Sequence, residues 1–162
     1  QRSPAQPQAT PASDVVQQAQ PTENLPQDEE VKEIPAAYTG PYSTDVEKPH
    51  LFVFVIPAQG VDKNMFIKGL EEFNRAGSTD GLTITEASVD EFRIAVIVNG
   101  LSDKEAAIRY SRMVIQNRAL YAPLENASYR NFLISTSNFD VFLTERNIAD
   151  YMEFYKQIYL IQ

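Results

Sequence analysis

The chain is organised around one uninterrupted apolar run, Leu51 to Ile56, which reads Leu-Phe-Val-Phe-Val-Ile and stops at Pro57. A strand with one face in water alternates apolar and polar residues. An unbroken run of aromatic, aliphatic and β-branched side chains is instead typical of a strand that is buried on both faces. We therefore expect a central strand here, onto which the rest of the chain can pack.

Residues 1–49, which precede this strand, have a different composition. They contain eight of the ten prolines, together with many Gln, Ala and Thr residues, and Asp28-Glu29-Glu30 is their densest charge run. Such a segment buries too little apolar surface to offset the entropy that is lost when it becomes ordered. We expect an extended or disordered Pro/Gln-rich linker over residues 1–49 and a folded domain over residues 50–162, with Tyr38 and Tyr42 lying against that domain.

Two segments of the domain have the apolar spacing of amphipathic helices. Phe66, Leu70 and Phe73 recur along one helical face, and Asp62 can cap the helix by accepting backbone N–H bonds. A second helix is expected after a capping box that begins at Ser102. Its expected buried face consists of Ala106, Tyr110, Met113 and Val114.

The remaining segments predict strands and two C-terminal helices. Strands are expected over residues 82–89, with a bulge near Glu86 or Ala87, then over Phe92–Val98 and over residues 132–134. Short helices are expected over residues 138–143 and after Asn147. The order strand, helix, strand, strand, helix, strand predicts an α+β fold. We expect a ferredoxin-like βαββαβ sandwich, an antiparallel sheet with helices on one face, extended by the C-terminal helices.

The residue types offer little for catalysis or metal binding. The chain has no cysteine, and His50 is its only histidine. A thiolate nucleophile is therefore excluded, and a transition-metal site is not expected. A histidine just before a buried strand is expected at the surface, not as a base or ligand. We expect a protein that is not an enzyme and that uses no cofactor.

One loop matches part of a phosphate-binding motif. Acylphosphatases of ferredoxin-like fold bind phosphate with Gln-Gly-Val followed closely by Phe-Arg, and this chain has Gln59-Gly60-Val61 after its first expected strand. Here Phe66 comes late and is followed by Ile67, so the phosphate-binding arginine is missing. Backbone amides alone would make a weak oxyanion site. Of the three functions that we consider, an enzyme is therefore the weakest hypothesis, after the two binding functions given below.

The charge balance restricts the classes of partner. The net charge is −8 and the isoelectric point is near 4.6. Nucleic acid and anionic lipid both need clustered Lys and Arg, so we expect neither as a partner. No stretch approaches the roughly 18 apolar residues that a membrane-spanning helix requires, and we expect no direct membrane span.

Aromatic residues are concentrated in the C-terminal third of the chain. Packing of the final helices explains most of them, while an exposed cluster would instead bind a partner peptide or a glycan, since Tyr and Phe are frequent at interfaces. The candidate partner-binding residues are Tyr38, Tyr42, Phe139, Phe142, Tyr155 and Tyr159.

Three segments carry a resemblance to a known family: His50–Pro57, Asp103–Tyr110 and Phe132–Phe139, the last continued by Asn147–Tyr151 and Phe154-Tyr155. Over residues 50–160 the chain resembles the C-terminal domain of Bacteroidetes envelope tetratricopeptide-repeat lipoproteins. These are PorW- and SprE-like proteins associated with gliding and type IX secretion. Residues 1–49 lie outside the resemblance, and the repeats of that family are absent from this sequence.

The resemblance implies a location and a class of partner. It implies a periplasmic, outer-membrane-associated scaffold, part of a longer lipoprotein, whose terminal domain binds envelope proteins, and it supplies no catalytic residues. Our leading hypothesis is a non-enzymatic protein-interaction module on a flexible leader, which would let the domain reach a partner at a distance. The alternative is a small-ligand, peptide or peptidoglycan-binding domain that uses the open face of the sheet.

Overall fold

The computed structural model describes residues 38–77, 79 and 81–160. All of them fall within one compact unit. Its elements, in chain order, are β1 (His50–Pro57), α1 (Lys63–Ala76), β2 (Thr83–Ser88), β3 (Arg93–Leu101), α2 (Lys104–Gln116), the 3₁₀ helix η1 (Arg118–Leu124), β4 (Arg130–Ser135), α3 (Thr136–Glu145), α4 (Ile148–Tyr155) and the π-helical turn η2 (Lys156–Leu160).

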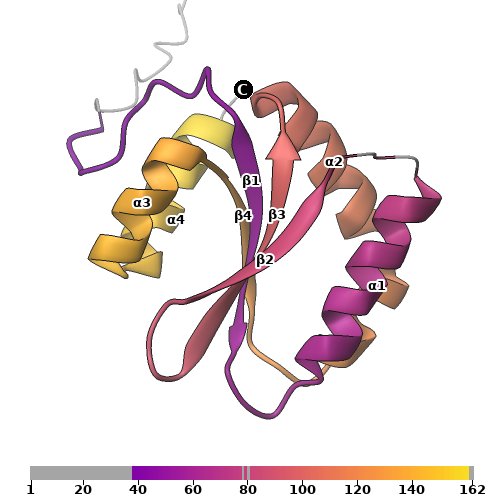
Figure 1. Ribbon diagram of the computed structural model, residues 1–162. Coiled ribbons are helices and arrows are strands. Elements are labelled where there is room, and N and C mark those ends of the chain that lie inside the picture. The colour runs from indigo at the N-terminus through magenta and orange to yellow at the C-terminus, as the bar shows by residue number, and fades with distance from the viewer. Residues whose placement is uncertain (1–37, 78, 80, 161–162) are drawn as a thin grey trace, which may run out of the picture. The chain divides into compact units, whose positions relative to one another are not determined.

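The expected α+β class is confirmed. The strands form one sheet in the order β2-β3-β1-β4, and every neighbouring pair is antiparallel. Helix α1 lies between β1 and β2 in the chain, and α2 lies between β3 and β4. Figure 1 shows α1 and α2 on one side of the sheet and α3 and α4 on the other.

Strand β1 is buried on both faces, as the apolar run predicts. Leu51 is 6% exposed, and the five residues after it are 2% exposed or less. Phe54 points toward α1, where its ring centroid lies 5.0 Å from that of Phe66. Val53 points to the other face, where it pairs with Phe132 of β4. The ring of Phe132 in turn contacts Phe142 of α3 at 5.3 Å.

The expectation of helices on one face only was wrong. Val53, Val55 and Phe132 would face water on the second side of the sheet if α3 and α4 were absent. Burying a large apolar side chain contributes about 1.5–3 kcal/mol, so the C-terminal helices stabilise the domain by packing on this face. The sheet is therefore the middle layer of three (Figure 1).

The bulge expected in the second strand is absent from the structure. Strands β2 and β3 stay in register from the pair Thr83 and Asn99 to the pair Ser88 and Ile94. Ile84 and Ala87 are partly buried on opposite faces of β2, and the buried Val89 lies in the turn beyond Ser88, so the apolar residues change face without a bulge. The register shift that the sheet does contain lies in β1, between His50 and Phe52.

Helix α2 begins one residue later than expected. Asp103, not Ser102, is the N-cap, and its carboxylate accepts the N–H of Ala106 at 2.8 Å. Tyr110 and Val114 are buried as expected, whereas Met113 is exposed. Aspartate and serine are about equally favoured at an N-cap, so the sequence pattern alone did not distinguish Asp103 from Ser102.

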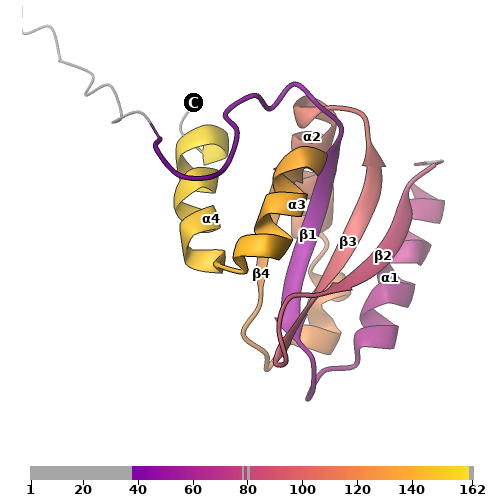
Figure 2. The same ribbon diagram turned by 60° about the vertical axis from the view of Figure 1, so that its left-hand side comes forward.

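The segment Tyr38–Pro49, which we call the strap, packs on the domain. Tyr42 is 4% exposed and Val46 is 9% exposed, and both belong to the hydrophobic core. In both views the strap passes α4 and α3 before it enters β1 (Figures 1 and 2). The domain therefore begins upstream of residue 50, while residues 1–37 of the expected linker lie outside the described residues.

Across the described ranges, no helix combines the length and apolar character that a membrane crossing needs.

Candidate functional site: the strap seat and the hairpin tip

The strap contains neither helix nor strand from Tyr38 to Pro49, and side chains hold it in place. Its apolar contacts come from Tyr38, Tyr42 and Val46, at intervals of four residues. We call the surface beneath it, formed by Asn138 of α3 with Tyr151 and Phe154 of α4, the strap seat.

Aromatic contacts fix the position of Tyr42. Its ring centroid lies 4.9 Å from that of Tyr151, edge to face, and 5.4 Å from that of Phe154. The Tyr151 hydroxyl donates to the carbonyl of Leu133 at 2.5 Å, which anchors the seat to β4. Edge-to-face pairs of this kind add about 0.5–1.5 kcal/mol beyond the burial of apolar area.

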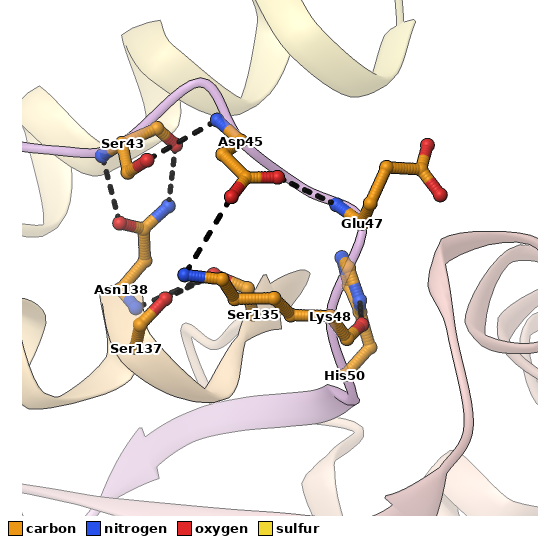
Figure 3. A network of polar contacts seen from close by, with 8 residues as sticks. All are labelled: Ser43, Asp45, Glu47, Lys48, His50, Ser135, Ser137 and Asn138. Atoms are coloured by element: carbon orange, nitrogen blue, oxygen red, sulfur yellow. Dashed lines mark hydrogen bonds and ion pairs between the residues drawn. The ribbon is translucent and has the colours of Figure 1, made fainter.

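Asn138 binds the backbone of the strap directly. Its Oδ1 accepts the N–H of Ser43 at 2.8 Å, and its Nδ2 donates to the carbonyl of the same residue at 2.9 Å (Figure 3). Ser135, the N-cap of α3, places this side chain by accepting the Asn138 N–H at 3.3 Å. Asn138 is only 1% exposed, so these two hydrogen bonds satisfy a buried amide.

Gly40 makes the close packing of Tyr38 feasible. A Cβ atom at Gly40 would collide with the Tyr38 ring, which folds back over it. In this position the Tyr38 hydroxyl accepts the N–H of Tyr42 at 3.4 Å, and its ring contacts Phe154 at 4.8 Å. The glycine therefore lets the strap carry two tyrosines on one short stretch of chain.

His50 joins the end of the strap to the C-terminal turn. Its Nδ1 lies 2.7 Å from the carbonyl of Lys48, and its Nε2 lies 2.8 Å from the hydroxyl of Tyr159 in η2. A carbonyl can only accept, so Nδ1 carries the proton and Nε2 accepts from Tyr159. The expectation that His50 lies at the surface was wrong, because its side chain is fully buried.

The surroundings of His50 keep the imidazole neutral. Burial lowers its pKa below the ordinary value of 6.5, and the nearby Lys104 ammonium acts in the same direction. The hydrogen bond to Lys48 and the carboxylates of Asp103 and Glu47 oppose this shift of the pKa without reversing it. The residue is thus a structural acceptor at neutral pH.

The candidate partner-binding residues largely form one buried cluster. Tyr42, Phe139, Phe142 and Tyr159 are all buried, and Tyr38 and Tyr155 are partly buried. Tyr151 lies at the centre of this cluster, and its ring contacts the rings of Tyr42, Phe142 and Tyr155. In the structure these side chains pack the second face of the sheet, and few of their atoms face solvent.

Phe92 is the exposed aromatic residue that the sequence analysis did not single out. It was expected at the start of a central strand, but β3 begins at Arg93, and Phe92 lies at the tip of the β2–β3 hairpin with 70% of its surface exposed. Its place directly after Asp90-Glu91, the two acidic residues that separate the expected strands over residues 82–89 and Phe92–Val98, was the available signal. The loop that carries it extends beyond the rest of the sheet in Figure 1.

The hairpin tip is fixed by Asp90. Its carboxylate accepts the N–H of Phe92 at 2.9 Å and the Nε of Arg93 at 2.8 Å. The Phe92 carbonyl accepts the N–H of Ala58 at 2.8 Å. The bonds that the carboxylate itself accepts, the one from Arg93 first, hold the pKa of Asp90 below its usual range, so the carboxylate stays charged at neutral pH.

Other parts of the surface offer less defined sites. A groove of about 500 Å³ between α1 and η1 is lined by Met65, Phe73 and Leu120 among others. Gln59 and Gly60 are exposed in the β1–α1 loop, while Phe66 of α1 is buried against β1. Within the described ranges, no cluster of three or more His, Cys, Asp or Glu residues is arranged to hold a metal ion.

The face proposed for ligand binding is partly covered. Helices α3 and α4 pack on it at β1 and β4, which leaves the part at β2 open, where Thr83 and Thr85 are exposed. There the Asn99 amide donates to the Thr85 hydroxyl at 2.9 Å.

A scan against protein-family models found no match to this chain, and searches of curated proteins and of solved structures found no similar protein.

Proposed function

We propose that this chain is a non-enzymatic protein-interaction or scaffold module of the bacterial cell envelope, carried on the leader expected from its sequence. The observation that carries the proposal is Phe92, an aromatic side chain that is 70% exposed on an ordered hairpin tip. Rigid, exposed aromatic side chains bury much area on binding at little cost in conformational entropy. Asp90 supplies that rigidity here through its bonds to Phe92 and Arg93.

We propose further that the topology is ferredoxin-like. The strand order β2-β3-β1-β4 supports this, because α1 and α2 each connect two strands that are separated by one antiparallel strand in the sheet. The C-terminal helices α3 and α4 would then be an addition that covers the face left open in the simplest form of such a sandwich.

The proposed location is periplasmic and outer-membrane associated, within a longer lipoprotein. The resemblance to PorW- and SprE-like domains over residues 50–160 is the basis for it. Envelope proteins would be the partners. The alternative function, binding of a small ligand, peptide or peptidoglycan, would use the part of the sheet face at β2 that α3 and α4 leave open.

A photocrosslinking experiment tests the interaction proposal. A photoreactive phenylalanine analogue replaces Phe92 in the full chain, which is then irradiated with envelope extract from a Bacteroidetes bacterium. Ile115 on α2, which is 50% exposed, provides a matched position for the control. We expect a discrete envelope protein to be captured from position 92 and not from position 115. Identical products from both positions, or none from either, would contradict the proposal.

A further inference from the structure

We infer that the strap seat is a peptide-binding site, which this chain fills with its own strap and which a peptide segment of a partner can fill in exchange. The inference rests on the proposed interaction function and names the class of partner. That partner is a segment that follows the bent path of the strap, with aromatic residues in the positions of Tyr38 and Tyr42 and a branched apolar residue in the position of Val46.

The seat recognises main chain through Asn138. This side chain pairs with both the N–H and the carbonyl of Ser43, at 2.8 and 2.9 Å. Neither bond involves a side chain of the strap, so the residue in the position of Ser43 can vary. Proline is excluded there because it has no N–H to donate.

The selectivity of the seat comes from its aromatic surface. Tyr151 and Phe154 receive the ring of Tyr42, with the ring of Tyr38 also on Phe154. The buried hydroxyl of Tyr42 finds no hydrogen-bond partner among the described residues. Phenylalanine therefore fits this position as well as tyrosine does. The ligand sequence that we infer is aromatic, any residue, glycine, any residue, aromatic, any residue except proline, any two residues, then Val or Ile, with the glycine required where Gly40 lies beneath the Tyr38 ring.

The strap can leave its seat without breaking the sheet. It supplies no strand, and β1 pairs with β3 and β4 through residues that begin at His50. Since the strap is covalently attached, its effective concentration at the seat is on the order of millimolar, and a free peptide must compete with it. A peptide in trans should thus bind poorly to the intact chain and better once the strap is weakened.

The test measures binding of a labelled synthetic peptide of residues 38–48 to the full chain by fluorescence anisotropy. Tyr42→Ala in the chain weakens the strap and leaves Asn138, Tyr151 and Phe154 unchanged. We expect the peptide to bind this variant at least tenfold more tightly than the unaltered chain. Adding Asn138→Ala to the variant should then reduce the affinity at least tenfold. A peptide that itself carries Tyr42→Ala is the matched control and should bind at least tenfold more weakly than the unchanged peptide.

A second variant and a site-specific signal keep the test decisive. If Tyr42→Ala does not fold, Val46→Ser weakens the strap at its other buried anchor. The side-chain amide resonances of Asn138 report whether the peptide occupies the seat. Equal affinity for the intact and weakened chains, or equal affinity of the two peptides, would overturn the inference. Because crosslinking from Phe92 does not involve the seat, this failure would be separate from failure of the proposed interaction function.

Discussion

The Nε2 of His50 lies 2.8 Å from the hydroxyl of Tyr159, so a hydrogen bond joins the first residue of β1 to the C-terminal turn η2. Lys104 of α2 strengthens the same corner. Its ammonium donates to the Ile158 carbonyl at 3.1 Å and lies 5.3 Å from the centroid of the Tyr159 ring. Three segments that are distant in the sequence are thus held together around one buried imidazole.

Replacing Tyr159→Phe should destabilise the domain. The substitution keeps the ring but leaves the buried Nε2 of His50 without a donor, and an unsatisfied buried group costs about 1–3 kcal/mol. Urea denaturation at neutral pH measures the free energy of unfolding. Tyr129→Phe serves as the control, because no hydrogen bond of that hydroxyl is present within the described residues, and its loss should have little effect. Equal stability of the two variants would contradict the role assigned to Tyr159.

The stability of the domain should decrease as the pH falls below the ordinary histidine pKa of about 6.5. The folded-state pKa of His50 is lowered, so the unfolded chain binds a proton before the folded chain does. The contribution is therefore fully present above pH of about 6.5 and is lost on acidification, by at most about 1.4 kcal/mol per pH unit, until the folded pKa is reached.

Two measurements isolate this effect from the titration of carboxylates. Urea denaturation of the natural chain and of His50→Gln, compared at neutral and mildly acidic pH, should show a smaller loss of stability in the variant. Since His50 is the only histidine, its NMR signals can be identified directly, and they should titrate below the ordinary histidine pKa. Titration at or above that value would contradict the neutral, buried acceptor.

Tyr42→Phe should stabilise the strap on its seat. The hydroxyl of Tyr42 is buried without a hydrogen-bond partner among the described residues, and burial raises its pKa far above the usual range. Removing such a group while keeping the ring avoids a desolvation cost of about 1–3 kcal/mol. Thermal denaturation should show a higher midpoint for Tyr42→Phe than for the natural chain, and a lower midpoint would show that the hydroxyl is satisfied.

Tyr110→Phe should loosen the contact between α1 and α2. The Tyr110 hydroxyl donates to Oδ1 of the buried Asn74 at 2.6 Å, and this bond joins the two helices on one face of the sheet. Its loss leaves the amide oxygen unsatisfied and should cost about 1–3 kcal/mol. Hydrogen exchange at the C-terminal end of α1 should become faster, while exchange in α3 and α4 on the opposite face should not change.

The sequence was informative where one residue determines its own local structure. Asp62 caps α1 and Asn147 caps α4, as their residue types predict. The run Leu51–Ile56 also predicted burial on both faces, because apolar character without alternation has a single explanation in a strand. The run could not reveal which elements bury the second face of β1. These are α3 and α4, which lie about eighty residues or more downstream.

The contact of Tyr38 and Tyr42 with the domain was expected, but the path of the strap and the burial of His50 could not be predicted, because they depend on distant partners. A Pro-rich segment with isolated aromatic residues has the composition of a linker, and only Asn138 and the aromatic surface of α4 give it a fixed path. His50 is buried because the strap and η2 both cover it. The exposure of Phe92 likewise depends on where β3 begins, and strand boundaries are poorly determined by local pattern.

Hydrogen exchange at one backbone amide, that of Ser43, tests most directly whether the strap is a structural part of this domain. In the structure this N–H donates to Oδ1 of Asn138 at 2.8 Å, although Ser43 itself is exposed to solvent. We predict that the Ser43 amide exchanges much more slowly than an unstructured amide and that Asn138→Ala abolishes this protection. Exchange of Ser43 at the unstructured rate in the natural chain would contradict it.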